Sequence, residues 1–399
     1  MPEAVIVATA RSPIGRANKG SLVDIRPDDL TAQIVTAVLA KVPELDPATV
    51  EDLILGCGQP AGESGFNVAR VAAILSGLEV PGVTVNRYCS SSLQTIRMAA
   101  HAIKAGEGDV FIAGGVETVS RFSAGFADSA PNPVFQPAGL RTLERAGGGQ
   151  PSWAPPEGLP DVYIAMGQTA ENVREFEGVS RAEMDEFAKR SQDLAVANQE
   201  NGFFADEISP VTLPDGTVVE QDDGPRAGVT LEGLAALKPV FRPDGEVTAG
   251  NACPLNDGAA AVVVMSDTRA NELGVTPLAR IVSSGVSALN PEIMGLGPIE
   301  ASRQALARAG KTIDDIDLVE INEAFAAQVI PSAKHLGIDL DKLNVHGGAI
   351  ALGHPFGMTG ARIMTTLIHG LQETGGTFGL ETMCVGGGQG MAMVIERLN

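Results

Sequence analysis

The residue best placed for covalent chemistry is Cys89, which stands directly before three consecutive serines. An apolar segment, residues 80–85, leads into it, and Leu93, Ile96 and Ala100 then recur at helical spacing. This pattern predicts a helix that begins at the serines. A cysteine there faces unpaired backbone N–H groups and the positive end of the helix dipole, so we expect a lowered thiol pKa. Cys89 is therefore a candidate nucleophile, with a buried structural cysteine as the alternative.

A thiol nucleophile needs a proton acceptor, for which histidine is the first candidate. His101 lies twelve residues further along the predicted helix, roughly 18 Å away, and is too distant to serve. His335 and His369 end helical patterns and are expected at the surface. His346 and His354 remain, and His354 is favoured because its flanking glycines and following proline give an extended backbone that a ligand can approach closely.

Two further segments carry polar groups of a suitable type. Cys384 precedes three glycines, residues 386–388, which suit a tight hairpin and also free backbone N–H groups to stabilise an oxyanion. Cys384 is thus a candidate second, acid/base thiol. Asn322 and Glu323 follow a predicted buried strand, and polar residues at the end of such a strand face a ligand crevice in α/β sheets.

The elements that position these groups alternate between strand and helix, which is typical of a mostly parallel sheet covered on both faces. The succession of helix, short turn and strand over residues 27–56 returns over residues 298–321. This indicates an internal duplication, with two similar α/β halves. Between them, residues 120–247 change in composition and carry predicted helices at 166–176 and 181–200. We interpret this segment as an insertion, and insertions commonly bear binding surfaces.

Composition narrows the class of protein. The 399 residues carry a formal charge of −21, which argues against nucleic acid or an anionic membrane as the partner. The four cysteines are far apart and form no C-x-x-C pair, which favours reduced thiols over disulfides or zinc. The apolar run 4–10 is too short for a signal peptide, and no run approaches membrane-spanning length. We expect a soluble, cytoplasmic protein.

Taken together, these motifs resemble those of the thiolase family over nearly the whole chain. The segments that carry the resemblance are Cys89 before the Ser-rich helix start, Gly250-Asn251-Ala252-Cys253-Pro254-Leu255-Asn256-Asp257-Gly258-Ala259-Ala260, Asn322-Glu323-Ala324-Phe325, Gly353-His354-Pro355 and Cys384-Val385-Gly386-Gly387-Gly388. The resemblance implies an α/β fold in which two duplicated thiolase-type halves form a five-layer α-β-α-β-α core with an inserted loop domain. The expected division is 1–119 plus 248–273, 120–247 for the coenzyme A-binding insertion, and 274–399.

The resemblance also implies catalytic roles. Cys89 would take the acyl group from an acyl-CoA, and His354 would activate it. Cys384 would remove the α-proton of a second acetyl-CoA, or return it in reverse. Asn322 would hold a water that completes one oxyanion hole with His354, and the backbone N–H groups of Cys89 and Gly386 would form the other.

Coenzyme A and acyl-CoA are expected as substrates, with no permanently bound cofactor and no metal. The positions that match the family's coenzyme A contacts are Met166, Arg226, Phe241, Ala249, Cys253, Leu255, Ala324 and Phe325. Arg226 meets an electrostatic need, because a protein of charge −21 must supply a local cation for a nucleotide phosphate. The resemblance further implies a homodimer or homotetramer, and it allows a partner in a β-oxidation multienzyme complex.

Several residues depart from the short-chain biosynthetic pattern of the family. Ala165 stands where those members have His, His346 where the family often has Asn, and Cys253 and Gly233 where it has serines. The stretch 118–122 also differs. These departures leave the acyl chain length open.

The predicted function is that of an acyl-CoA C-acyltransferase. It would cleave 3-ketoacyl-CoA with coenzyme A, or condense two acetyl-CoA, by a ping-pong mechanism through S-acyl-Cys89. One alternative is a decarboxylating ketoacyl synthase, although such enzymes generally use two histidines. The other is a non-catalytic acyl-CoA-binding subunit.

Overall fold

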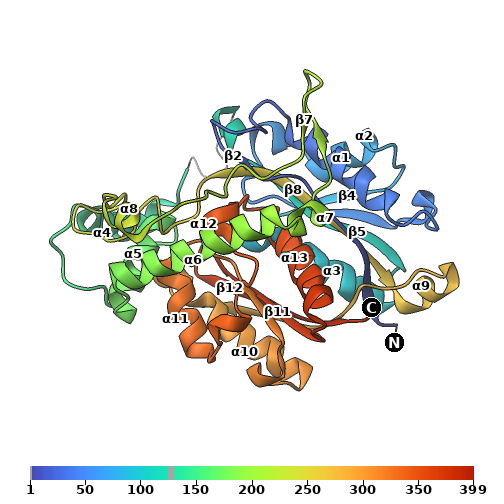
Figure 1. The fold of residues 1–399 in the computed structure, drawn as a ribbon. Coiled ribbons are helices and arrows are strands. Elements are labelled where there is room, and N and C mark those ends of the chain that lie inside the picture. The colour runs from blue at the N-terminus through green and yellow to red at the C-terminus, as the bar shows by residue number, and fades with distance from the viewer. Residues whose placement is uncertain (1, 125–129) are drawn as a thin grey trace.

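A computed structural model describes residues 2–124 and 130–399 of the chain (Figure 1). The first half contains strands β1 (Ala4–Arg11), β2 (Gly15–Arg16), β3 (Asp52–Gly56), β4 (Gly82–Val85), β5 (Val110–Thr118) and β8 (Asn256–Ser266). Its helices are α1 (Pro27–Ala40), α2 (Val68–Leu75), α3 (Ser91–Ala105) and α9 (Asp267–Leu273), with 3₁₀ turns η1 (Pro47–Thr49), η2 (Gly62–Ser64) and η3 (Tyr88–Ser90).

The second half repeats this succession. Its strands are β9 (Ala279–Ala288), β10 (Leu318–Ile321), β11 (Phe378–Val385) and β12 (Gln389–Arg397). Its helices are α10 (Gly297–Ala309), α11 (Ala326–Leu336), α12 (Ala349–Leu352) and α13 (Thr359–Thr374), with 3₁₀ turns η6 (Pro291–Leu296), η7 (Ile313–Asp315) and η8 (Leu340–Lys342).

The segment between β5 and β8 holds the remaining elements. They are η4 (Val119–Ala124), η5 (Pro133–Phe135), α4 (Gln136–Ala146), α5 (Met166–Glu177), α6 (Arg181–Glu200), α7 (Phe203–Glu207), β6 (Val211–Thr212), β7 (Val218–Val219) and α8 (Leu231–Ala235). The helices predicted at 166–176 and 181–200 are therefore confirmed. The domain boundaries themselves stay a prediction.

Local sequence explains where these helices begin and end. Pro27 stands in the first turn of α1, with Asp28 and Asp29 beside it at the positive end of the dipole. Ser180 and Glu183 form a capping box at the start of α6. Gly106 ends α3 in the left-handed conformation, with φ 77°. These local signals mark where the three helices begin or end.

Strand pairing confirms the duplication. In the described residues the ten-stranded sheet runs in the order β10-β11-β12-β9-β1-β8-β5-β3-β4, with β2 beside β8. In the first half β3 is parallel to β4 and β5, while β8 is antiparallel to β5 and β1. In the second half β10 is parallel to β11, and β12 is antiparallel to β11 and β9. The prediction of a mostly parallel sheet is therefore wrong: the sheet is mixed, because β1, β8, β9 and β12 pair antiparallel with their neighbours. Leu343 forms a parallel bridge to Val319 of β10, in the position that β4 occupies beside β3.

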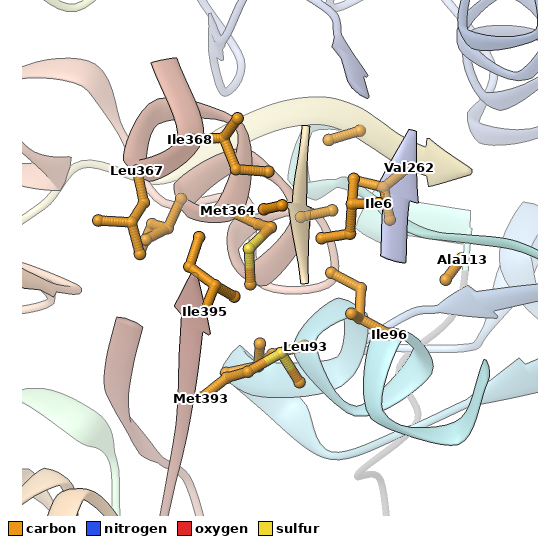
Figure 2. Packing of buried hydrophobic residues seen from close by; sticks show 14 of the residues in the cluster. Ile6, Leu93, Ile96, Ala113, Val262, Met364, Leu367, Ile368, Met393 and Ile395 are labelled. Atoms are coloured by element: carbon orange, nitrogen blue, oxygen red, sulfur yellow. The ribbon is translucent and has the colours of Figure 1, made fainter. Parts of the chain in front are cut away.

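Three buried apolar clusters define the helical layers. One joins residues of α1 and α2, such as Leu30 and Val68, to one face of the first half's strands. Another joins α10 and α11 to the second half. The third lies between the halves, where Leu93 of α3 and Met364 and Leu367 of α13 pack among strand residues of both halves (Figure 2). The predicted five-layer core is confirmed. α3 and α13 are buried between two layers of strands, and the residues discussed below lie at their N-terminal ends.

Among the described residues, no helix has both the length and the apolar character required to cross a bilayer.

Candidate active site

Cys89 lies in a tight turn that leads directly into α3. The turn is closed because the Ser91 hydroxyl donates to the Tyr88 carbonyl at 2.7 Å and accepts from the Arg87 N–H at 2.9 Å. Tyr88 has φ 43°, a left-handed conformation that costs a non-glycine residue about 1–3 kcal/mol. The fold thus holds the residue before the candidate nucleophile in a strained conformation.

The sulfur of Cys89 is buried, and the backbone N–H groups of Gly386 and of Cys89 itself lie near enough to lower the pKa of its thiol. Burial nevertheless raises the pKa of the thiol to about 11, the two N–H groups lower it, and the nearby Glu117 raises it further. The predicted lowering of this pKa is wrong for the ligand-free protein. Loss of water around the sulfur outweighs the backbone dipoles.

Cys384, from the second half, lies close to Cys89. It lies at the end of β11, fully buried, just before the turn of Gly386, Gly387 and Gly388 that leads into β12. Burial raises its pKa well above the usual range, and the neighbouring thiols of Cys89 and Cys253 raise it further. Both cysteines are therefore neutral thiols near neutral pH.

His354 is held in one tautomer by its neighbours. The Thr359 hydroxyl donates to the Pro355 carbonyl at 2.8 Å, so its oxygen accepts from His354 Nδ1 at 2.6 Å. Nδ1 carries the proton, and Nε2 is left as a proton acceptor, 3.3 Å from the amide nitrogen of Asn322. Burial lowers the pKa of His354 to about 3, and the Arg362 guanidinium lowers it further. The imidazole is neutral and able to take a proton.

A cavity of about 430 Å³ opens beside Cys89. It is lined by Gly58, Gln59, Tyr88, Cys89, Pro131, Val162, Tyr163, Ile164, Ala165, Met166, Phe356, Gly386 and Gly387. The Phe356 ring lies edge-on to the His354 ring, with centroids 5.3 Å apart. Asn322 follows β10, and Cys384 lies on the adjoining strand β11. The five predicted catalytic residues come from four separate segments. Cys89 and Gly386 line the cavity, Cys384 lies close to Cys89, and Asn322 contacts His354.

Glu117, which sequence reasoning missed, connects the loops of this site. Its buried carboxylate accepts from the backbone N–H groups of Gly58 at 2.8 Å, Gln59 at 3.1 Å and Gly357 at 2.9 Å. Burial raises its pKa to about 7 against these three bonds, which lower it. Glu117 so joins the loop after β3 to the loop that carries His354. Its only signal in the sequence is a single acid inside the apolar run of β5.

Five of the predicted coenzyme A contacts lie together. Met166, Phe241, Cys253, Ala324 and Phe325 share one apolar cluster, in which the Phe241 and Phe325 rings meet edge-on at 6.1 Å. The Cys253 N–H donates to the Ala324 carbonyl at 3.0 Å.

The other three predicted contacts, Arg226, Ala249 and Leu255, are exposed. No ion pair among the described residues involves Arg226, so its guanidinium is available to a ligand. The assignment of all eight residues to coenzyme A stays a prediction.

The remaining histidines are not part of this site. His335 is exposed and pairs with Glu177. His346 stacks on Phe203, with ring centroids 3.8 Å apart, and contacts Glu373. His369 was predicted at the surface but is only partly exposed, because Phe203 of α7 packs against its ring.

Comparison with known proteins identifies the family to which this chain belongs. The family model described as the thiolase N-terminal domain matches residues 4–268, and the thiolase C-terminal domain matches residues 275–397. The chain is 44% identical to a β-ketoadipyl-CoA thiolase of Acinetobacter baylyi, over 100% of both chains. It is also 44% identical to a 3-ketoacyl-CoA thiolase of Bacillus subtilis, over 99% of this chain and 100% of that one.

A solved structure agrees with the sequence relatives. The acetyl-CoA acetyltransferase of Bacillus anthracis superposes with a TM-score of 0.87 at 40% identity, covering 100% of this chain and 99% of the other. The chain belongs to the thiolase family, and the class of enzyme that these relatives support is an acyltransferase.

Proposed function

We propose that this protein is an acyl-CoA C-acyltransferase that works through S-acyl-Cys89 and cleaves 3-ketoacyl-CoA with coenzyme A. The observation that carries the proposal is the surroundings of the Cys89 sulfur. Backbone N–H groups of Gly386 and Cys89 lie near it beside an open cavity, and the neutral His354, whose Nε2 carries no proton, contacts Phe356 in the wall of that cavity. We assign these two N–H groups as the donors to the oxyanion that forms when this sulfur attacks a carbonyl carbon.

The protonation states favour a particular order of events. Because the thiol pKa is about 11 and the imidazole pKa about 3, the resting pair is neutral rather than thiolate and imidazolium. Attack of the Cys89 sulfur on the 3-keto carbon therefore goes together with transfer of its proton to His354. The bond between C2 and C3 then breaks, and its electron pair remains on the departing acetyl-CoA unit.

Completing the cycle needs a proton donor and a second thiol. Cys384, a buried neutral thiol, protonates the departing acetyl-CoA carbanion and is left as a thiolate. The sulfur of coenzyme A then attacks S-acyl-Cys89, and the proton of the coenzyme A thiol passes to Cys384. The bond between the acyl group and Cys89 breaks, and the shortened acyl-CoA leaves. His354 returns its proton to the Cys89 sulfur. The Oδ1 of Asn322 is buried with no hydrogen-bond partner among the described residues, which fits the role of holding a water.

Intact-protein mass spectrometry tests the covalent step. Incubation with acetyl-CoA should add one acetyl group to the wild-type chain, and Cys89→Ala should remove that addition. Cys57→Ala is the matched control, since it removes another buried thiol, and should keep it. An acetyl group on another residue, or none, would contradict the proposal. Activity that depends on a malonyl thioester would instead favour the decarboxylating alternative.

The cavity favours a neutral acyl chain. None of its described lining residues is charged, and the stretch 125–129, Gly-Phe-Ala-Asp-Ser, contains no cation. A carboxylate at the end of the acyl chain would therefore lose water without gaining a partner. Of the two substrate types named among the relatives, 3-ketoacyl-CoA fits this lining better than β-ketoadipyl-CoA.

A matched pair of substrates tests this preference. Both 3-ketohexanoyl-CoA and 3-ketoadipyl-CoA have six-carbon acyl groups, but only the second ends in a carboxylate. We expect kcat/KM for thiolysis to favour the neutral substrate by at least about tenfold. Preference for the adipyl substrate would refute the neutral-chain assignment and leave the acyl-transfer mechanism standing.

A further inference from the structure

A second cavity, of about 340 Å³, lies where the C-terminal part of α3 meets the second half. It is bounded by α3 from the first half and by β9 and α10 from the second. Its lining residues are Arg97, Ala100, His101, Lys104, Ile281, Val282, Ser283, Ser284, Arg308 and Met393. Four of them are basic and none is acidic, in a protein that has 49 acidic residues against 28 lysines and arginines.

The basic side chains come from two helices. Residues 97, 101 and 104 are spaced four and three apart, which places them on one face of α3. Arg308 comes from the last turn of α10. The cluster therefore depends on the packing of both halves and not on a run of basic residues in the sequence.

Short contacts to β9 hold the charged groups at the cavity. Arg97 Nε donates to the Ser284 hydroxyl at 3.1 Å, and Arg308 Nη1 donates to the Ser284 carbonyl at 2.6 Å. Lys104 Nζ donates to the Ile281 carbonyl at 3.3 Å and has a long ion pair with Glu3 at 3.8 Å. His101 makes no hydrogen bond or ion pair within the described part of the chain.

Neighbouring cations disfavour the charges of Arg97 and His101. Burial lowers the pKa of Arg97, and the nearby Arg87 and Arg308 lower it further. Burial also lowers the pKa of His101, with added repulsion from Arg97, Lys104 and Arg308. An anion of two or more charges in the cavity would turn this repulsion into attraction, and guanidinium groups match phosphate oxygens in geometry.

We propose that this cavity is a binding site for a phosphate-bearing small molecule, held by Arg97, His101, Lys104 and Arg308. Its volume is in the range of small-molecule sites. It shares no lining residue with the cavity beside Cys89. The two sites lie on one rigid helix, with His101 roughly 18 Å along α3 from Cys89. The proposal does not depend on the proposed acyl transfer.

Titration calorimetry with inorganic phosphate, at constant ionic strength set by chloride, tests the site. We expect saturable binding to the wild-type protein. The Arg97→Ala/Arg308→Ala double variant should bind at least about tenfold more weakly, since it loses two charge-assisted contacts. The same variant should keep its rate of thiolysis, because neither arginine lines the catalytic cavity.

Two single variants serve as controls. Arg269→Ala removes a half-buried arginine that pairs with Glu272, and Arg226→Ala removes the expected phosphate contact of coenzyme A. Both variants should leave phosphate affinity unchanged. Absence of saturable binding, or equal affinity in the double variant, would overturn the proposal. Loss of binding in Arg226→Ala alone would also overturn it. So would dissociation of an oligomer by the double variant in sedimentation, because the cluster would then be a subunit interface.

Discussion

At the residue scale, the chemistry of this site depends on burial more than on the helix dipole. The position of Cys89 before α3 was evident in the sequence, but the direction of its pKa shift was not. That shift depends on β11, Gly386 and Glu117, which pack around the sulfur from distant parts of the chain. Sequence reasoning found His354 and Cys384 because flanking glycines mark them. It missed Glu117 because an acid at the end of an apolar strand has no spacing signature.

Glu117 provides a pH-dependent test of this view. Its pKa rises from 4.5 in the unfolded chain to about 7 in the folded protein. The folded state therefore binds more protons between these values, and the contribution of Glu117 to stability is full below 4.5 and is lost as the pH rises through 7. The total change is on the order of 3 kcal/mol.

Urea denaturation of the wild type and of Glu117→Gln, at pH 5 and pH 8, measures this contribution. Gln cannot ionise, and at either pH its amide loses at least one of the three backbone N–H bonds. The variant should therefore be less stable than the wild type at pH 5, and the difference should shrink or reverse at pH 8. A difference that is the same at both pH values would show that the Glu117 carboxyl does not titrate in this range.

At the scale of elements, the sequence predicted most helices and strands well. Periodicity, capping residues and glycine C-caps act locally, so α1, α3, α5 and α6 were found within a few residues of their ends. The repeated order of elements was visible for the same reason. The contacts between α3 and α13 were not visible, because helix–helix packing is decided by which small residues let two backbones approach.

Gly360 marks the closest approach of these two helices. A Cβ at this position would collide with the backbone nitrogen of Leu93 at the start of α3. We expect Gly360→Ala to lower the free energy of unfolding by about 1–3 kcal/mol, since the backbone must shift to admit the methyl group. Denaturation monitored by circular dichroism measures the change.

Gly139 is the matched control for this substitution. It lies inside α4, and no heavy atom lies within 4 Å of its added Cβ. Gly139→Ala should leave stability unchanged or raise it by about 0.5–1 kcal/mol, because alanine favours the helix. Equal effects of the two substitutions would contradict the packing explanation.

At the scale of the whole molecule, a chain of charge −21 repels the anionic substrates that we propose for it. Long-range repulsion slows their approach, and salt screens it over about 10 Å at 0.1 M. Contacts to buried groups are screened much less. We expect the apparent KM for coenzyme A to fall as ionic strength rises from about 0.01 M to 0.1 M. Steady-state thiolysis at fixed pH measures it, and a KM that rises over this range would show that local cations such as Arg226 dominate.

The strand register is repeated in the two halves, so the residues around the candidate active site occupy corresponding positions in each half. Gly56 of β3 pairs with Gly115 of β5, and Cys57 and Glu117 follow one and two residues beyond that pair. Ile321 of β10 pairs with Thr382 of β11, and Asn322 and Cys384 follow at the same two steps. Cys89 and His354 likewise precede the inner helices α3 and α13.

Pseudo-symmetric positions therefore hold different side chains. Cys57 and Glu117 in the first half correspond to Asn322 and Cys384 in the second half. Each half contributes one member of the proposed pair, Cys89 as nucleophile and His354 as base. Neither half expressed alone contains both reacting groups, so the smallest unit able to carry out the proposed acyl transfer is the joined pair of halves.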